Sequence, residues 1–226
     1  MSDLIIFDVG GIVLRMDFAT MFAEFAKHSK HTADEIKKRF AKTAIDKHLM
    51  LGEGEEEYFD GIRAIIENYS VSDGELLRIL KLCIPAQIDE MVALKRRLHE
   101  ASYRIGIFSN IGRWACQYLD QELPEVLESW GGPRVFSYQA HHIKPEPAVY
   151  ALFREEAGRI FYLDDKSAYL KYPVEHLGWI GIHLTCYQDF DEPIRHVGEG
   201  HQDARISGEW HEAATPADVE KILTHV

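Results

Sequence analysis

Five polar residues follow three apolar segments of this sequence, each at a point where a buried strand would end. Asp8 follows LIIF, Ser109 and Asn110 follow RIGIF, and Asp164 and Asp165 follow RIFYL. Branched and aromatic residues in such runs are suited to the buried strands of a parallel sheet. The carboxyl ends of parallel strands meet at one edge of the sheet, where ligands bind in open α/β folds. We therefore expect these five side chains to converge on one site.

The residue types at this expected site suit a divalent cation. Two carboxylates such as Asp8 and Asp164 repel each other unless a positive charge lies nearby. Mg²⁺ is a hard cation that takes oxygen ligands, usually one or two carboxylates together with water and substrate phosphate. Gly10 and Gly11 follow Asp8 in the sequence, and their lack of side chains lets the backbone approach a ligand closely. The sequence therefore predicts Mg²⁺ as the cofactor.

Three residues suit the binding of a phosphoryl group. Ser109 and Asn110 can donate hydrogen bonds to phosphate oxygens, and Lys144 adds a positive charge in the loop IKPEP, which two prolines stiffen. Each feature is common in isolation, because a Ser-Asn pair often forms a turn, KPEP a surface loop, and Asp-Asp a helix start. Together and in this order, they indicate phosphoryl transfer with an aspartate as the covalent nucleophile.

Helical patterns follow one another from residue 17 to about residue 99, with no convincing strand. Capping boxes at Thr32 with Glu35 and at Ser72 with Glu75 mark two of the helix starts. Apolar periodicity predicts helices over 18–25, 32–49, 55–69, 72–85 and 86–100. The first four of these helices would form a bundle inserted after the first strand.

Strands and helices alternate after residue 103. We expect strands over 104–108, 135–137, 159–163 and 179–184, separated by helices over 114–119, 147–156 and 169–176. Such alternation predicts an α/β fold with a doubly wound, Rossmann-like parallel sheet. We assign 1–16 and 86–226 to this core domain and 17–85 to a helical domain. The stretch 188–211 lacks periodicity and reads as a surface loop, and a last helix is expected from Thr215 to about Thr224.

Composition excludes several classes of protein. The chain has 226 residues, of which 46% are hydrophobic, so it can bury a sizeable core. Its formal charge of −12 and lack of Lys/Arg-rich runs argue against a nucleic-acid partner. Cys83, Cys116 and Cys186 are widely spaced and fit core thiols in a reducing compartment. The amino terminus resembles neither a signal peptide nor a membrane anchor. We expect a cytoplasmic protein without a membrane partner, as a monomer or homodimer.

Four short motifs occur in a familiar order: FDVGG, IFSN, the lysine of IKPEP, and FYLDD. With these motifs the chain resembles the haloacid dehalogenase-like (HAD) superfamily hydrolases that carry a helical, C1-type cap after the first strand. The similarity also includes GEGEEEYF and LDDKSAYLKYPVEHLGW, and it extends from about Leu4 to Leu184. Within the superfamily the chain most resembles the cap-bearing sugar-phosphate phosphatases, such as the glucose-1-phosphate phosphatases.

The resemblance implies a role for each residue at the strand ends. Asp8 would attack phosphorus and form an aspartyl-phosphate. Asp8, Asp164 and the backbone carbonyl of Gly10 would bind Mg²⁺, and Asp165 would support the metal either directly or through another ligand.

The resemblance also assigns the phosphate contacts and the helical segment. Ser109 and Lys144 would hold the phosphoryl group of a small phosphorylated substrate, and Asn110 would help to orient it. The helical segment at about 17–84 would close over the site, exclude water and determine which substrate is accepted.

The sequence departs from the family motif at Gly10. Phosphatases of this family usually carry a second aspartate there, which acts as general acid and base. Such assistance is worth about 10²- to 10⁴-fold in rate, so slow turnover or a preference for good leaving groups, such as anomeric sugar phosphates, is expected.

Ile12 also replaces a common threonine or valine, which affects packing more than chemistry. His141 and His142 precede Lys144 and are candidate substitutes for the missing acid, although loop histidines are more often solvated.

Three functions are compatible with these residues. The first is a magnesium-dependent phosphatase of a small phosphorylated metabolite. The second is a 2-haloacid dehalogenase, which also lacks the second aspartate but needs no metal and has lost the acidic fourth motif. The third is a non-catalytic protein that binds a phosphorylated ligand or a partner protein through the same pocket, for which Gly10 is the main support. The retained Asp164 and Asp165 favour the phosphatase.

Overall fold

The computed structural model describes residues 2–153, 158–185 and 206–226, and it contains a six-stranded, all-parallel sheet. The strands are β1 (Leu4–Phe7), β2 (Arg104–Ser109), β3 (Gly131–Phe136), β4 (Ile160–Asp164), β5 (Ile180–Leu184) and β6 (Trp210–Ala213). Their order across the sheet is β3-β2-β1-β4-β5-β6. This order is that of a doubly wound sheet and confirms the predicted fold class.

The strand order reverses next to β1, which lies between β2 and β4. Ligands of open α/β sheets bind in the crevice at such a reversal, beyond the carboxyl ends of the strands. Phe7 of β1 pairs with Leu163 of β4, so the residues that follow them, Asp8 and Asp164, lie side by side at the carboxyl ends of the two strands. The register therefore places the two aspartates of the predicted site at this crevice.

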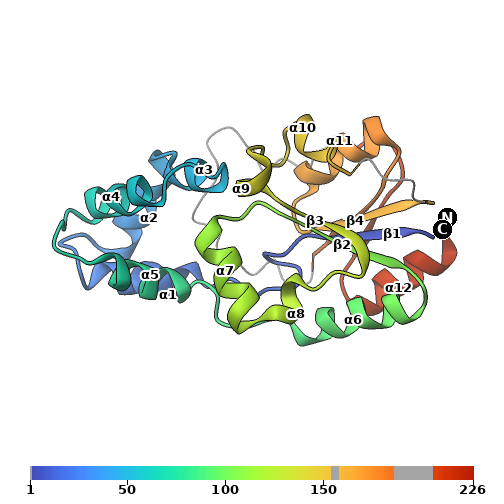
Figure 1. Cartoon of the computed structure of the whole chain (residues 1–226), viewed down its shortest axis with the longest axis horizontal. Helices are drawn as coiled ribbons and strands as arrows, with labels where there is room; N and C mark the ends of the chain where they lie inside the picture. Colours follow the sequence, from blue (N-terminus) through green and yellow to red (C-terminus); the bar gives the residue numbers. More distant parts are fainter. Residues whose placement is uncertain (1, 154–157, 186–205) are drawn as a thin grey trace.

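Helices cover both faces of the sheet. They are α6 (Asp89–Glu100), α7 (Arg113–Glu122), α8 (Pro124–Leu127), α9 (Ser137–Ala140), α10 (Pro147–Tyr150), α11 (Ser167–Leu177) and α12 (Pro216–His225). Figure 1 shows α6 and α12 below the sheet and α10 and α11 above it. Because both faces are covered, all four residues of β1 are fully buried, as in other parallel sheets.

Five helices lie between β1 and α6 and extend away from the end of the molecule that carries both termini (Figure 1). They are α1 (Phe18–Ala26), α2 (Ala33–Lys42), α3 (Ile45–Met50), α4 (Glu55–Ile66) and α5 (Asp73–Lys81), and we call residues 18–81 the helical insertion. Aromatic packing stabilises it, since the rings of Phe22 and Phe40 meet edge to face at 5.3 Å between centroids.

Residues 8–17 lead from β1 to the helical insertion and residues 82–88 lead back to α6, and we call these segments the outgoing and the returning linker. The amide of Arg15 donates to the carbonyl of Ala86 at 2.9 Å, and the amide of Ile88 donates to the carbonyl of Val13 at 2.8 Å. Leu14 pairs with Gln87 in an isolated antiparallel bridge. The chain thus leaves and re-enters the core along one ribbon. The division into domains at residues 17 and 85 stays a prediction.

Several helices differ in extent from the sequence prediction. The predicted helix 32–49 is two helices, because Thr43 adopts an extended conformation and its hydroxyl donates to the carbonyl of Phe40 at 2.9 Å. The helix predicted over 55–69 ends at Ile66, since Glu67 is left-handed. The helix predicted from 86 begins at Asp89, because the preceding residues pair with the outgoing linker. The helix predicted over 72–85 ends at Lys81.

The carboxyl-terminal part of the sheet contains a strand that the sequence prediction missed. Trp210 and His211, assigned to a surface loop over 188–211, begin β6, which pairs in parallel with β5. This edge strand has only four residues, two of them charged or polar, so it lacks the apolar pattern on which strand prediction relies. Residues 188–205 of the predicted loop lie outside the described residues. The helix predicted from Thr215 to about Thr224 is confirmed, since α12 covers Pro216–His225 with Thr215 as its N-cap.

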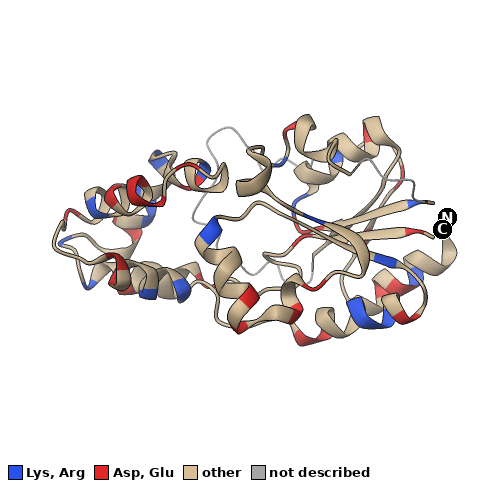
Figure 2. Cartoon of the chain, viewed as in Figure 1, with Lys and Arg blue, Asp and Glu red and all other residues tan. Residues whose placement is uncertain are grey.

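Charged side chains of both signs are mixed over the helical insertion, as Figure 2 shows. Arg78 pairs with Glu24 and Glu75, and Arg39 pairs with Glu67.

Cys83 and Cys116 are buried free thiols, as predicted, and Cys186 lies outside the described residues. In the described part of the chain, no helix combines the length and the apolar composition that a membrane span requires. Cytoplasmic location and the absence of a nucleic-acid partner stay predictions.

Candidate active site

Three carboxylates meet at the crevice between β1 and β4. Asp8 follows β1, Asp164 ends β4 and Asp165 comes next, and one oxygen from each lies within 4.8 Å of the others. Asp164 is fully buried and Asp8 nearly so. An all-oxygen, carboxylate-rich donor set of this kind fits Mg²⁺, which prefers hard oxygen ligands. The structure therefore brings together the three acidic side chains that the sequence singled out for the metal.

Lys144 lies between two of these carboxylates. Its Nζ is 2.9 Å from Oδ1 of Asp8 and 2.8 Å from Oδ2 of Asp164, and its side chain is only 1% exposed. Burial opposes the charge of Lys144, but the two neighbouring carboxylates outweigh it and raise its pKa. The lysine therefore stays cationic inside the site, where it can attract a phosphoryl group.

The pKa of the Asp8 carboxyl group is raised to about 6. Burial raises its pKa, the nearby charge of Lys144 opposes this shift, and the charge of Asp164 adds to it. Three carboxylates and one ammonium carry a net charge of −2 when all four groups are ionised. A divalent cation would balance this charge.

Tyr162 belongs to the site although the sequence analysis did not select it. Its hydroxyl donates to Oδ2 of Asp164 and accepts a hydrogen bond of 3.0 Å from Nζ of Lys144. Burial raises its pKa well above the usual range, and the charge of Asp164 adds to this. Tyr162 and Asp164 are two residues apart on β4 and so share one face of the sheet. That spacing was the signal that could have identified the tyrosine.

Ser109 and Asn110 occupy the end of β2, next to β1. Ser109 is the buried last residue of that strand. The side chain of Asn110 accepts from the amide of Lys144 at 2.8 Å and donates to the carbonyl of the same residue at 3.1 Å. Asn110 therefore fixes the backbone of the lysine loop. The phosphate contacts expected of Ser109 and Asn110 stay predictions.

The two glycines after Asp8 differ in their surroundings. Gly11 has a φ of +79°, and a Cβ atom there would lie 2.6 Å from Oδ2 of Asp165. A Cβ atom at Gly10 would lie 3.7 Å from the sulfur of Met16, which is an ordinary contact. The close approach of the loop to Asp165 therefore requires glycine at position 11, whereas position 10 has room for a side chain.

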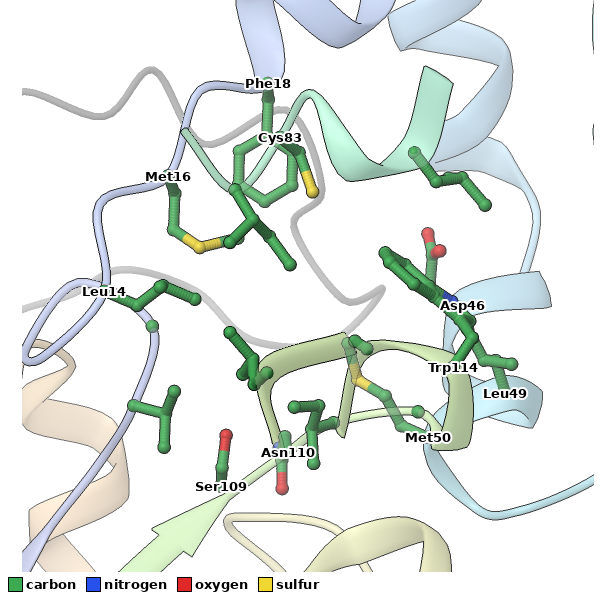
Figure 3. Close-up of a pocket in the computed structure, with 18 of the residues that line it drawn as sticks. Leu14, Met16, Phe18, Asp46, Leu49, Met50, Cys83, Ser109, Asn110 and Trp114 are labelled. Atoms are coloured by element: carbon green, nitrogen blue, oxygen red, sulfur yellow. The ribbon is translucent and has the colours of Figure 1, made fainter. Parts of the chain in front are cut away.

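Two cavities open at the site. One of about 130 Å³ is lined by Asp8, Gly10, Lys144 and Asp165, together with Lys166 and Tyr169. A second, of about 180 Å³, lies between the sheet edge and the helical insertion (Figure 3). Both include Ser109 and Met50 in their linings, so they are neighbours. We call them the Asp8 cavity and the insertion cavity.

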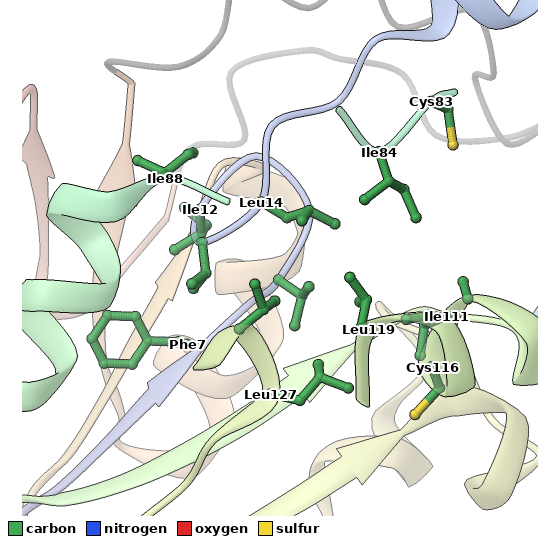
Figure 4. Packing of buried hydrophobic residues seen from close by; sticks show 14 of the residues in the cluster. Phe7, Ile12, Leu14, Cys83, Ile84, Ile88, Ile111, Cys116, Leu119 and Leu127 are labelled. Atoms are coloured by element: carbon green, nitrogen blue, oxygen red, sulfur yellow. The ribbon is translucent and has the colours of Figure 1, made fainter. Parts of the chain in front are cut away.

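Apolar side chains from the linkers and from the α7 region surround the insertion cavity. Leu14 and Ile84 come from the two linkers, Leu119 comes from α7, and Ile111 from the turn before it (Figure 4). All four are buried in the main hydrophobic core. This part of the cavity wall is therefore continuous with the hydrophobic core.

The two histidines before Lys144 do not line either cavity. Nδ1 of His141 lies 2.8 Å from the carbonyl oxygen of Leu51, which joins this loop to the helical insertion. Nδ1 of His142 lies 3.3 Å from Oε2 of Glu146. Their contacts therefore do not support a role as the missing acid.

Comparisons of sequence find no protein-family model and no curated protein that matches this chain. Comparisons of structure find many solved chains with this fold. A HAD family enzyme from Bacteroides thetaiotaomicron, crystallised with magnesium and inorganic phosphate, superposes with a TM-score of 0.70 at 20% identity, covering 86% of this chain and 100% of that one. An L-2-haloacid dehalogenase superposes with a TM-score of 0.65 at 15% identity, covering 99% of both chains. At these identities the similarity establishes a shared fold.

Proposed function

Starting from the haloacid dehalogenase fold of this chain, we propose that it is a magnesium-dependent phosphatase that hydrolyses a small phosphorylated metabolite. One observation carries the proposal: Asp8, Asp164 and Asp165 meet around the cationic Lys144 beside a cavity at the strand ends. Phosphoryl transfer needs this combination of nucleophile, positive charge and metal ligands.

Asp8 acts as the nucleophile in this proposal. One of its carboxylate oxygens attacks phosphorus, the bond from phosphorus to the ester oxygen breaks, and the leaving group departs as an alkoxide with the electron pair of that bond and takes a proton from water. Water then attacks the aspartyl-phosphate, which releases inorganic phosphate and restores the carboxylate of Asp8. Lys144 holds the negative oxygens of the phosphoryl group throughout.

Asp8, Asp164, Asp165 and the carbonyl of Gly10 are the groups that would hold Mg²⁺. The bound cation would supply positive charge against the phosphoryl oxygens. Tyr162 and Lys144 orient the Asp164 carboxylate, to which both donate hydrogen bonds.

Gly10 itself offers no side chain that could protonate the leaving group. A substrate whose alcohol is a good leaving group depends least on such a proton. We therefore infer that the rate depends more steeply on the leaving group than in phosphatases with the second aspartate.

The dehalogenase alternative shares the fold, as the L-2-haloacid dehalogenase shows. The three clustered carboxylates favour the phosphatase, because a metal-independent dehalogenase has no use for the acidic residues at the end of β4. A non-catalytic, phosphate-binding protein would retain Lys144 and the cavity but would not turn over substrate.

The proposal is tested with a panel of phosphorylated metabolites, p-nitrophenyl phosphate and acetyl phosphate, each assayed with Mg²⁺ or with EDTA. We expect phosphate release that requires Mg²⁺ and that falls at least about 10³-fold in Asp8→Asn. Asp34→Asn, the same change at an exposed position of α2, is the matched control and should keep the wild-type rate.

Two results would contradict the phosphatase proposal. Binding of inorganic phosphate without turnover of any ester would favour the non-catalytic protein. Chloride release from 2-chloropropionate without Mg²⁺ would identify a dehalogenase.

A further inference from the structure

The insertion cavity adjoins the Asp8 cavity and extends from it toward the helical insertion. Gly10, Met16, Ser109 and Asn110 line both. A ligand whose phosphoryl group lies beside Asp8 can therefore place its organic part in the insertion cavity. This geometry makes the insertion cavity the place where a substrate would be distinguished from other phosphate esters.

Most side chains around the insertion cavity are apolar. The helical insertion contributes Phe18, Met21, Phe40, Leu49 and Leu80. Methionine side chains are flexible and adapt to the shape of an apolar ligand. A sugar carries a hydroxyl on nearly every carbon, and this wall has few partners for such groups. The lining therefore favours an apolar organic group over the sugar that the family resemblance suggested.

The helical insertion also contributes one buried acidic residue, Asp46, to the wall of the insertion cavity. Its residue is 7% exposed, and its Oδ1 accepts a hydrogen bond of 3.0 Å from the hydroxyl of Tyr58. Its Oδ2 is buried without a hydrogen-bond partner among the described residues. Burial raises the pKa of Asp46 to about 6, and the hydrogen bond from Tyr58 opposes this shift. A buried carboxylate oxygen without a partner is costly unless a ligand supplies one.

Trp114 of α7 also lines the insertion cavity. Its indole Nε1 is buried and has no hydrogen-bond partner among the described residues. Figure 3 shows Asp46 and Trp114 on the side of the cavity away from Ser109. The end of the cavity opposite the phosphoryl site thus offers one acceptor and one donor without protein partners, beside Tyr58, whose hydroxyl already donates to Asp46.

We propose that the substrate is a phosphate monoester with a compact apolar organic group that ends in a hydrogen-bond donor, an ammonium or a hydroxyl, bound by Oδ2 of Asp46. This inference rests on the proposed phosphatase function and deepens it. Asp46 is then the specificity-determining residue, and Trp114 orients a terminal hydroxyl, which can accept from the indole while it donates to Asp46.

The size of the cavity restricts the organic group. Its volume is about 180 Å³. An apolar cavity of roughly 150 Å³ in another protein binds benzene, so one ring or a short chain fits here. A substrate that lacks the terminal donor would leave Asp46 buried without its partner, which disfavours binding strongly.

The test measures binding with phosphonates, which are not hydrolysed, so it does not depend on turnover. Benzylphosphonate, 4-(hydroxymethyl)benzylphosphonate and 4-(aminomethyl)benzylphosphonate are titrated into wild type, Asp46→Asn and Asp34→Asn by calorimetry with Mg²⁺ present. We expect wild type and Asp34→Asn to bind at least one substituted ligand about 10-fold or more tightly than benzylphosphonate. In Asp46→Asn this preference should fall to about 3-fold or less.

Each outcome of the titrations decides the proposal. A preference for the aminomethyl ligand identifies an ammonium as the terminal donor, and a preference for the hydroxymethyl ligand identifies a hydroxyl. Equal binding of all three ligands by wild type would overturn the proposal, as would a preference that survives in Asp46→Asn. Circular dichroism confirms that each variant is folded.

Failure of the phosphatase function can be distinguished from failure of the proposed role of Asp46. The corresponding benzyl phosphates would then not be hydrolysed by wild type, although the phosphonates would still show a preference that depends on Asp46. The opposite case, in which only the role of Asp46 fails, would give hydrolysis of p-nitrophenyl phosphate together with equal binding of the three phosphonates. In that case the phosphatase proposal would stand and the role of Asp46 would be wrong.

Discussion

Gly10 is the residue at which the active-site loop departs most from the motif that it resembles. The space around it does not require glycine, because a Cβ atom would meet only Met16, at 3.7 and 3.9 Å. Gly11 differs, since its positive φ and the nearby Asp165 carboxylate exclude a side chain. The missing aspartate is therefore a chemical feature of this chain rather than a packing requirement.

Replacing Gly10 with aspartate should increase turnover. A carboxyl group at this position would supply the proton that the leaving alcohol lacks, and we expect kcat to rise about 10-fold or more on esters with poor leaving groups. The measurement is kcat for a series of phosphate esters that differ in the pKa of the alcohol. The Gly10→Asn variant adds a similar volume without an ionisable group and should show no increase. Equal rates for both variants would refute the argument.

At the scale of the secondary elements, Lys95 connects α6 to α8. Its Nζ donates to the carbonyls of Glu125 and Val126 at 3.0 and 2.9 Å, although the residue is fully buried. Burial lowers the pKa of Lys95 to about 7 from the ordinary 10.5. The short helix α8 is thus held by a lysine that loses its proton near neutral pH.

This lysine predicts a pH dependence of stability. Between pH 7 and 10.5 the unfolded chain binds the Lys95 proton and the folded chain does not, so the free energy of unfolding should rise with pH in this range. Below pH 7 both states bind the proton and this contribution no longer changes. Urea unfolding at pH 7 and pH 9.5 measures the effect in wild type, Lys95→Met and the exposed-site control Lys38→Met.

Lys95→Met should lose the rise between the two pH values, and Lys38→Met should keep it. If wild type and Lys95→Met changed in parallel with pH, the depressed pKa of Lys95 would be wrong. The paired comparison removes contributions from other groups, since they titrate equally in both proteins.

At the scale of the whole molecule, the site is assembled from distant parts of the chain. Asp8 follows β1, Lys144 comes from the loop after α9, and Asp164 ends β4. The helical insertion adds Asp46 across the second cavity. A ligand at this site therefore contacts segments that lie far apart in the sequence, and its binding should stabilise the fold as a unit.

Mg²⁺ together with inorganic phosphate should raise the Tm of the wild-type protein. At concentrations about 100 times the dissociation constant, linkage contributes about 2.7 kcal/mol. For a chain of this size that corresponds to an increase of about 5 to 10 °C. Thermal unfolding followed by circular dichroism measures the shift, which EDTA should reverse. Asp164→Asn should show a much smaller increase, and an unchanged wild-type Tm would count against the metal site.

The local sequence determined the strand ends and several helix starts. Apolar runs before Asp8, Ser109 and Asp164 become β1, β2 and β4, because a buried parallel strand needs such runs on both faces. The capping box of Thr32 and Glu35 begins α2 as predicted, since it satisfies backbone groups within one turn. Edge strand β6 was missed, because its stability comes from pairing with β5 rather than from its own apolar pattern.

Only the tertiary structure decided the contacts that the four motifs do not predict. The motifs placed Asp8, Lys144 and Asp164 at one edge of a sheet, because the carboxyl ends of parallel strands must meet there. Nothing local in the sequence indicates that Asn110 would bind the lysine loop or that Asp46 would face the insertion cavity. Asn110 and Lys144 are 34 positions apart, and the lining of the insertion cavity extends from Val9 to Lys166, so chain folding rather than local periodicity brings these groups together.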